Sequence, residues 1–174
     1  MKLTWFGASA FRVHSGGAIV VMEPDAAGAG FDRAELVSGA DQVVGFGESG
    51  MTLASVGWKP RAPLRPLEVE EQNRAPDIVA LDADTLIVDA DGEAPVVVVR
   101  GDMPQLGKWA DRAIFVLAGA GLKSRAEGLL ERASPRLIAL AGDEAEVEQA
   151  FLALRDKLDG TGMIALERAL AVEV

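Results

Sequence analysis

The stretch AIFVLAGAGLKSRAEGLLERASPRLIALAGDEAEVEQAFLAL, residues 113–154, alternates short apolar runs with longer segments of mixed polarity. The apolar runs have the length and composition of buried strands, which predicts strands over 113–117 and 136–141. The longer segments have helical spacing, which predicts helices over 124–133 and 144–158. Ser124 and Asp143 are the expected N-caps of these helices. With a last strand or pair of strands over 163–174, the β-α-β-α-β order is typical of a sheet covered by helices.

The centre of the chain carries the clearest strand signals. Three apolar runs separated by acidic turns predict an antiparallel meander over 78–81, 85–88 and 95–100. A helix is expected over 104–112. The segment 59–66 holds three prolines among basic residues and is expected to be an extended connection.

The N-terminal third also predicts β structure. Strands are expected over 3–13 and 18–22, with the turn signal Ser15-Gly16-Gly17 between them, so these residues should form a hairpin. A further short strand is expected over 42–44. The length of 174 residues fits one domain spanning 1–174, and the pattern as a whole predicts an α/β (α+β) fold class.

The charge of the chain is strongly negative. Seventeen Lys and Arg against 27 Asp and Glu give a formal charge of −10, which repels phosphate backbones and anionic lipids. Nucleic acid and membrane are therefore not expected as partners. No apolar run approaches the roughly 20 residues that span a bilayer, and no secretory leader pattern opens the sequence, so the expected location is cytoplasmic.

The sequence is poor in metal ligands and nucleophiles. It has one histidine, His14, and no cysteine, so a histidine-rich zinc site and a thiolate site are both excluded. Zinc is accordingly not expected as a cofactor. His14 follows the first strand beside a turn, which favours an ordinary surface histidine over a general base. Three tryptophans, Trp5, Trp58 and Trp109, are expected to be core or interface anchors.

Two segments near the N-terminus resemble a known family. Residues 1–11 read MKLTWFGASAF, and after the Gly16-Gly17 turn residues 20–24 read VVMEP. They resemble the metallo-β-lactamase superfamily, specifically its small predicted metal-dependent hydrolases, which open with Trp-x-Gly-His-Ser/Ala-x-Phe. Ala8 stands where that family usually has histidine, and Glu23 stands where it usually has aspartate.

Later landmarks of the family follow in the same order. Its His-x-His-x-Asp-His motif falls on a segment in which the histidine positions hold Gly47, Ser49 and Thr52 and the aspartate position holds Met51. Residues 98–103 resemble the strand that ends in Gly-Asp-Thr, so Asp102 matches an aspartate that bridges metals in the family. Segments 113–121 and 135–142 resemble two strands that lead to family histidines, and neither segment has one.

The resemblance implies a shortened metallo-β-lactamase-like αββα sandwich whose metal-ligand histidines are lost. The function it implies is that of a pseudoenzyme that binds a partner or ligand or self-associates as a homo-oligomer. The alternative is a residual hydrolase that uses Mg²⁺ or Mn²⁺, since these ions accept all-oxygen ligand sets. Its ligands would be carboxylates around Asp102, with Glu23, Asp25 and Glu48 as candidates. Against this alternative, strand-end carboxylates are also common as solvated turn residues.

Overall fold

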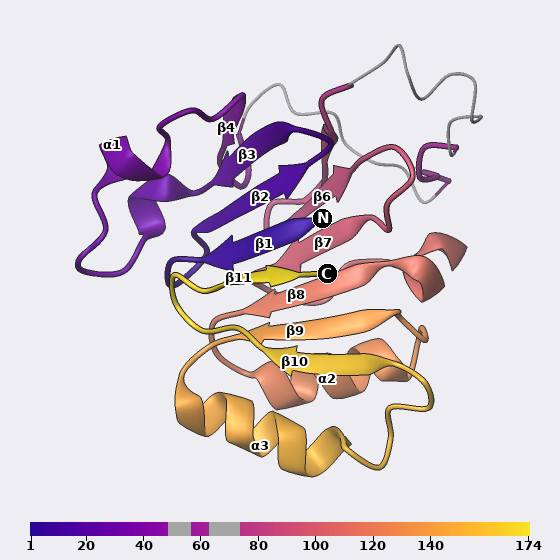
Figure 1. Cartoon of the computed structure of the whole chain (residues 1–174). Coiled ribbons are helices and arrows are strands. Elements are labelled where there is room, and N and C mark those ends of the chain that lie inside the picture. Colours follow the sequence, from indigo (N-terminus) through magenta and orange to yellow (C-terminus); the bar gives the residue numbers. More distant parts are fainter. Residues whose placement is uncertain (49–56, 63–73) are drawn as a thin grey trace.

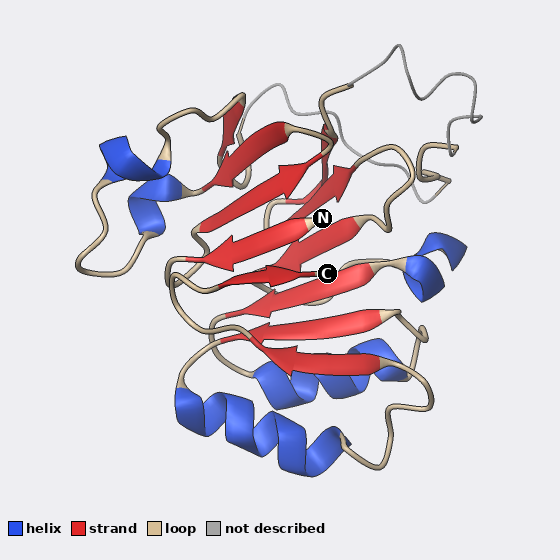
Figure 2. Cartoon of the chain, in the orientation of Figure 1, coloured by secondary structure: helices blue, strands red, loops and turns tan. Residues whose placement is uncertain are grey.

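The computed structural model describes residues 1–48, 57–62 and 74–174, which form two stacked β-sheets with helices (Figure 1; Figure 2). The first sheet has the strand order β11 (Ala171–Glu173), β1 (Lys2–Trp5), β2 (Phe11–Ser15), β3 (Ala18–Met22) and β4 (Gln42–Val44). The second has the order β10 (Gly162–Ala165), β9 (Leu137–Ala141), β8 (Ile114–Ala118), β7 (Val96–Val99), β6 (Thr85–Asp89) and β5 (Asp77–Asp82). This architecture confirms the predicted mixed α/β fold class.

Helices cover the two sheets unequally. The outer face of the second sheet carries α2 (Leu122–Leu130) and α3 (Glu144–Leu154), as Figure 2 shows. Beside the first sheet lie the four-residue α1 (Arg33–Leu36) and the 3-10 turn η1 (Pro24–Ala26). The Arg12 guanidinium on β2 donates to the carbonyl oxygens of Leu36 and Ser38, at 3.2 and 3.0 Å. The outer layer over the first sheet is therefore short, and a polar contact helps to hold it in place.

The core consists of two apolar clusters. One fills the space between the sheets and includes Trp5, Phe11 and Val116, while the other lies between the second sheet and its helices and includes Phe115 and Leu154. Neighbouring residues of one strand thus point into different clusters, as the alternation of side chains along a strand requires. Strands β6, β7 and β8 are buried on both faces, which explains why their sequences read as nearly continuous apolar runs.

The second half of the chain follows the sequence prediction closely. Strands β7, β8, β9 and β10 are parallel, and β5, β6 and β7 form the expected antiparallel meander. Asp143 caps α3, because its carboxylate accepts the backbone N–H of Glu146 at 2.9 Å. The final segment is a pair of strands, of which β10 joins the second sheet and β11 pairs with β1 in the first. The two termini are therefore tied together, and Val174 donates to the carbonyl of Met1 at 3.0 Å.

Four predicted elements are wrong in detail, and of these the helix expected over 144–158 ends already at Leu154. The strand expected over 3–13 is two strands, because Gly7 has a φ of +105° and the chain turns back so that Phe6 N–H bonds Ala10 C=O at 2.9 Å. The helix expected over 104–112 is only the 3-10 turn η2 (Lys108–Arg112), which follows an extended Gly107. Helix α2 begins at Leu122 after Gly121, so Ser124 lies inside the first turn and is not its cap.

The parallel arrangement gives the sandwich two distinct ends. In Figure 1 strands β8, β9 and β10 run from right to left. We call their left-hand end the C-terminal edge; its loops are 6–10, 23–28, 45–48, 82–84, 100–103, 119–121, 142–143 and 166–168. We call the other end the N-terminal edge; its segments are 15–17, 59–61, 90–95, 108–113 and 134–136. Within the described ranges, no helix is long and apolar enough to cross a membrane.

The turn at Gly7 yields a test of the fold. A Cβ at Gly7 would lie 2.9 Å from the backbone nitrogen of Gly28, whereas one at Gly30, at a similar φ of +98°, would meet no atom within 4 Å. Gly7→Ala should therefore lower the free energy of unfolding by about 1–3 kcal/mol more than Gly30→Ala, because only the former adds overpacking to backbone strain. Urea denaturation of both variants measures the difference, and equal losses would show that the two loops do not approach as described.

Candidate functional site

Ala8 borders a small cavity at the C-terminal edge. It lies in the turn between β1 and β2, where its carbonyl oxygen accepts the indole N–H of Trp5 at 3.0 Å. The cavity has a volume of about 240 Å³ and is lined by Trp5, Ala8, Gly119, Ala120, Ala141, Gly142, Asp143 and Arg168. The fold thus brings together Ala8 and the ends of the segments 113–121 and 135–142, the places at which the sequence resemblance predicts lost histidines.

The chemistry of this cavity is that of small side chains and one cation. The Arg168 guanidinium carbon lies 5.5 Å from the centroid of the Trp5 ring, which is a cation–π distance. Asp143 supplies a carboxylate, but that group already caps α3. The described lining therefore offers one carboxylate and no imidazole, which is too few donors for a catalytic metal.

Glu23, Asp25 and Glu48 line a second cavity at the same edge, with a volume of about 250 Å³. Two of these carboxylates already have partners. Glu23 accepts the backbone N–H of Phe46 at 2.7 Å, and Asp25 pairs with Arg33 at 2.8 Å. Although the three residues line one cavity, they do not form a cation site, since no group of three or more His, Asp or Glu in the described ranges could hold a metal ion.

The other predicted site residues do not add ligands to this group. Asp102 is exposed in the loop after β7, and Gly47 is exposed with a φ of +71° after β4. The predicted positions Ser49, Met51 and Thr52 lie outside the described residues. His14 is on β2, exposed beside the N-terminal edge. Slight desolvation on the strand, and then the charges of Arg12 and Lys2, lower the pKa of His14, so its imidazole is mainly neutral at neutral pH.

Arg125 is a principal feature of the C-terminal edge that sequence reasoning missed. From the first turn of α2 its guanidinium donates to four backbone carbonyls: those of Val99, Gly101, Ala118 and Ala120, at 3.2, 3.2, 2.7 and 2.8 Å. It thereby joins the ends of β7 and β8. Burial lowers the pKa of Arg125, while the nearby charges of Glu146 and Asp102 raise it. A cation in the first turn of a helix opposes the helix dipole, and that is the one signal in the sequence that could have pointed to it.

Arg100 occupies the neighbouring part of the same edge. Its Nε lies 2.8 Å from a carboxylate oxygen of Asp84, and its Nη1 lies 3.3 Å from the carboxylate of Glu23. The guanidinium carbon also lies 4.6 Å from the centroid of the Phe46 ring. Arg100 therefore connects the end of β7 with the loops after β3, β4 and β5, and it uses the carboxylate of Glu23 that a metal would need.

The described residues at the C-terminal edge do not fit a metal centre. A catalytic site needs about three nitrogen or oxygen ligands that converge on one point and an open position for water. Here the carboxylates are dispersed and those of Glu23, Asp25 and Asp84 are paired with arginines, while three guanidinium groups add positive charge that repels a divalent cation. What this arrangement does chemically is to satisfy strand-end carbonyls and carboxylates with arginine N–H groups.

Comparison with known proteins supports the fold. No protein-family model matches the chain, and no curated protein is significantly similar to it. Among solved structures it is similar to Igni18, a novel metallo hydrolase from the hyperthermophilic archaeon Ignicoccus hospitalis KIN4/I. The TM-score is 0.50 at 14% sequence identity, and the match covers 98% of this chain and 97% of the other. The chain therefore has a metallo-hydrolase-like fold over nearly its whole length.

The role of Arg125 yields a second test. Arg125→Met keeps an unbranched side chain of similar length but leaves four carbonyl oxygens without their donor. The free energy of unfolding should therefore fall by on the order of 2–4 kcal/mol. Arg132→Met is the matched control, because Arg132 is exposed just after α2 and donates to two carbonyl oxygens only, those of Gly128 at 2.8 Å and Pro104 at 3.4 Å. In this control the free energy of unfolding should fall by less than about 1 kcal/mol. Chemical denaturation measures the free energy of unfolding of both variants. Similar losses of stability would show that Arg125 does not hold the ends of β7 and β8 together.

Proposed function

We propose that this chain is a pseudoenzyme: a degenerate, non-catalytic relative of the metallo-β-lactamase superfamily that binds a partner or ligand, or self-associates. The observation that carries the proposal is the arginine arrangement at the C-terminal edge. Arg125 and Arg100 connect strand ends and loops at this edge, where the former metal positions would lie if the resemblance holds residue by residue. A half-buried guanidinium with four carbonyl acceptors is a structural tie, and it is not poised to activate water.

The residues around Ala8 support the same proposal. By resemblance, Ala8 and the ends of segments 113–121 and 135–142 correspond to places where the family carries histidine. In this chain the fold brings them to one cavity lined mainly by Gly and Ala. A loss of ligands from several separate segments of a retained scaffold is what a protein that no longer needs a metal would show. Metal binding normally adds stability to the folded state, and arginine contacts at the same edge can supply stability in its place.

The alternative, a residual Mg²⁺- or Mn²⁺-dependent hydrolase around Asp102, has less support. It requires at least three carboxylates within coordination distance of one point. Glu23 is paired with Arg100 and Asp25 with Arg33, so binding a metal would first break these two contacts. Asp102 lies in the field of the Arg125 guanidinium, which further disfavours a divalent cation beside it.

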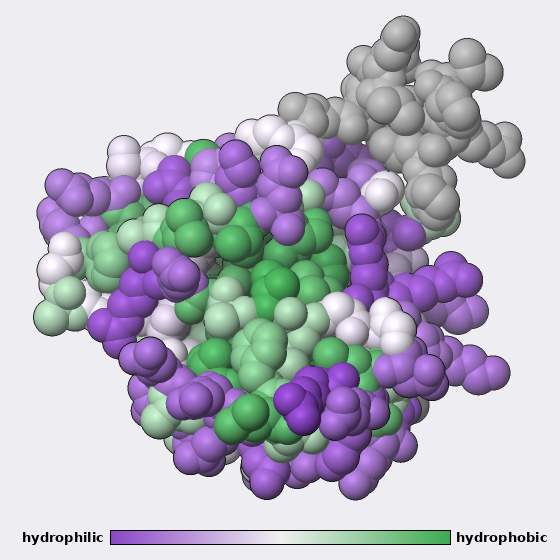
Figure 3. All heavy atoms as spheres, turned by 60° about the horizontal axis from the view of Figure 1, so that its bottom comes forward, coloured by the Kyte–Doolittle hydropathy of each residue, from purple (hydrophilic) through white to green (hydrophobic). Residues whose placement is uncertain are grey.

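Among the roles open to this pseudoenzyme, self-association is favoured by a specific surface. At the edge strands β10 and β11, the apolar side chains of Met163, Ile164 and Val172 are only partly buried. Figure 3 shows a continuous hydrophobic area on the face that is turned forward, bordered by polar residues. Exposed apolar area at sheet edges is where another β-sheet protein, or a second copy of this one, can pack. A homo-oligomer and a cytoplasmic location both stay predictions.

Metal analysis tests the proposal. Untagged protein purified without chelators, then incubated with Zn²⁺, Mn²⁺ or Mg²⁺ and dialysed, should retain less than about a tenth of an equivalent of each metal, because structural and catalytic sites bind far more tightly than scattered carboxylates. Inductively coupled plasma mass spectrometry measures the content. Retention of about one equivalent of one metal per chain would contradict the proposal and favour the residual hydrolase.

A further inference from the structure

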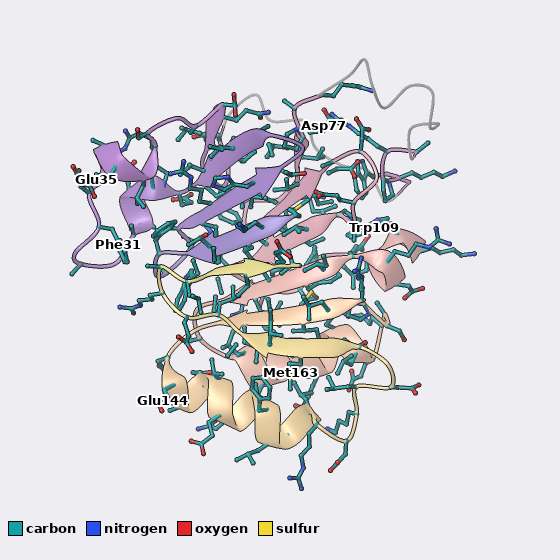
Figure 4. All side chains as sticks on the ribbon, in the orientation of Figure 1. Phe31, Glu35, Asp77, Trp109, Glu144 and Met163 are labelled. Carbon is teal, nitrogen blue, oxygen red and sulfur yellow. The ribbon has the colours of Figure 1, made fainter. Side chains whose placement is uncertain are left out.

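We propose that the N-terminal edge holds a binding pocket for a small polyanion, meaning a compact molecule that carries two or more phosphate or carboxylate groups. The pocket has a volume of about 870 Å³, within the range of small-molecule sites. It is lined by Lys59, Pro60, Arg61, Gly92, Glu93, Ala94, Pro95, Lys108, Trp109, Asp111, Arg112 and Arg136. In Figure 4, Trp109 and Asp77 mark this end of the molecule, and Phe31 marks the opposite end. The pocket is therefore separate from the C-terminal edge, and the proposal does not depend on whether that edge binds metal.

The charge of the pocket is opposite to that of the chain. Five cationic side chains line it, against the two carboxylates of Glu93 and Asp111, although the whole protein carries a formal charge of −10. A concave region of one sign concentrates the potential and attracts ions of the other sign. The cations come from the segment 59–61, from η2 and from the residue before β9, so the fold gathers them here from separate parts of the chain.

Both carboxylates of the pocket are already engaged. Glu93 pairs with the N-terminal ammonium of Met1 at 2.9 Å and also accepts the hydroxyl of Ser15. Asp111 accepts the backbone N–H of Ser134 at 3.0 Å. The ammonium compensates the charge of Glu93, whereas Asp111 keeps its negative charge beside the cations.

Arg61 forms a fixed wall of the pocket. Its side chain is only 11% exposed and pairs with Asp77 and, at 3.5 Å, with Asp91, while its backbone N–H donates to Asp89 at 2.8 Å. The hydrogen bond from Arg61 lowers the pKa of Asp77, so this pair remains ionised over the neutral range. Arg61 thus anchors the segment 59–61 to the second sheet, and its charge is largely compensated.

Four cations remain for a ligand: Lys59, Lys108, Arg112 and Arg136. All four are exposed, and none of their side chains hydrogen-bonds or pairs with an acid in the parts of the chain that the structure describes. Like charges that share a concavity repel one another, and a bound anion removes that repulsion. A solvated face that merely promotes solubility would not need to collect cations around a hollow in an acidic protein.

The geometry also selects the kind of anion. Arginine presents a planar fork of N–H donors that matches the oxygens of a phosphate or carboxylate, while lysine adds a mobile point charge. Four such groups around a hollow of this size suit a compact polyanion better than one phosphate. Trp109, Ala94 and Pro95 add an apolar part to the lining, so a short carbon skeleton can be accommodated. A long nucleic acid is disfavoured, because the rest of the acidic surface repels its backbone.

Calorimetric titration of the full chain tests this pocket with pyrophosphate and citrate as probes, at constant ionic strength. At least one probe should bind at one site with a Kd below about 1 mM in roughly 0.15 M salt, where weak surface attraction is largely screened. The double variant Arg112→Gln/Arg136→Gln should weaken that binding at least about tenfold. The matched control Arg132→Gln/Arg155→Gln removes the same charge from exposed arginines outside the pocket lining and should bind as the unchanged protein does.

Three results would overturn the proposal. One is the absence of binding by both probes, and another is an equal loss of affinity in the two double variants, which would indicate general charge attraction. The third is tighter binding of a single-stranded oligonucleotide than of either probe, because that would make the face a nucleic-acid surface. Circular dichroism establishes that each variant folds, which is expected because all four substituted side chains are exposed. None of these results bears on the metal content, so the pseudoenzyme proposal is judged separately.

Discussion

The guanidinium of Arg125 satisfies a constraint that any parallel sheet imposes where its strands end together. Strand-end carbonyls that no further ladder can pair need donors, and a buried carbonyl left without one costs stability. Arg125 reaches four of them from α2 and fixes the ends of β7 and β8 relative to that helix. The neighbouring Arg100 extends the same kind of contact to the loops after β3, β4 and β5.

The two ends of the sandwich differ because their charges are arranged differently. At the C-terminal edge, Arg100, Arg125 and Glu23 are paired or bonded to backbone, and the two cavities there have volumes of only about 240 and 250 Å³. At the N-terminal edge a larger hollow collects cations that have no partner among the described residues. Function depends on sites and not on the fold, so a fold of this class can keep its scaffold when a site changes.

Much of the fold followed from the sequence, because apolar runs, acidic turns and the Asp143 cap report local structure directly. The split of the strand over 3–13 was missed because Gly7 turns the chain inside a segment that otherwise reads as β structure. The absence of a histidine ligand set was also clear from composition alone. The cation in the first helical turn marks Arg125 as unusual, but its role as a tie was not predictable, since its partners are backbone carbonyls that residue identity does not reveal. The pocket was missed for a related reason: Lys59, Lys108 and Arg136 meet only in the folded chain.

In the function proposed above, arginine contacts and not a metal stabilise the C-terminal edge. Thermal unfolding in the presence of EDTA, and separately with excess Zn²⁺, Mn²⁺ or Mg²⁺, distinguishes the two, because a ligand that binds the folded state raises the midpoint temperature. We expect the midpoint to change by less than about 1 °C in every case, since negligible binding leaves stability unchanged. If one of these metals raised the midpoint by several degrees and EDTA reversed the rise, the protein would have a functional metal site, which would contradict this account.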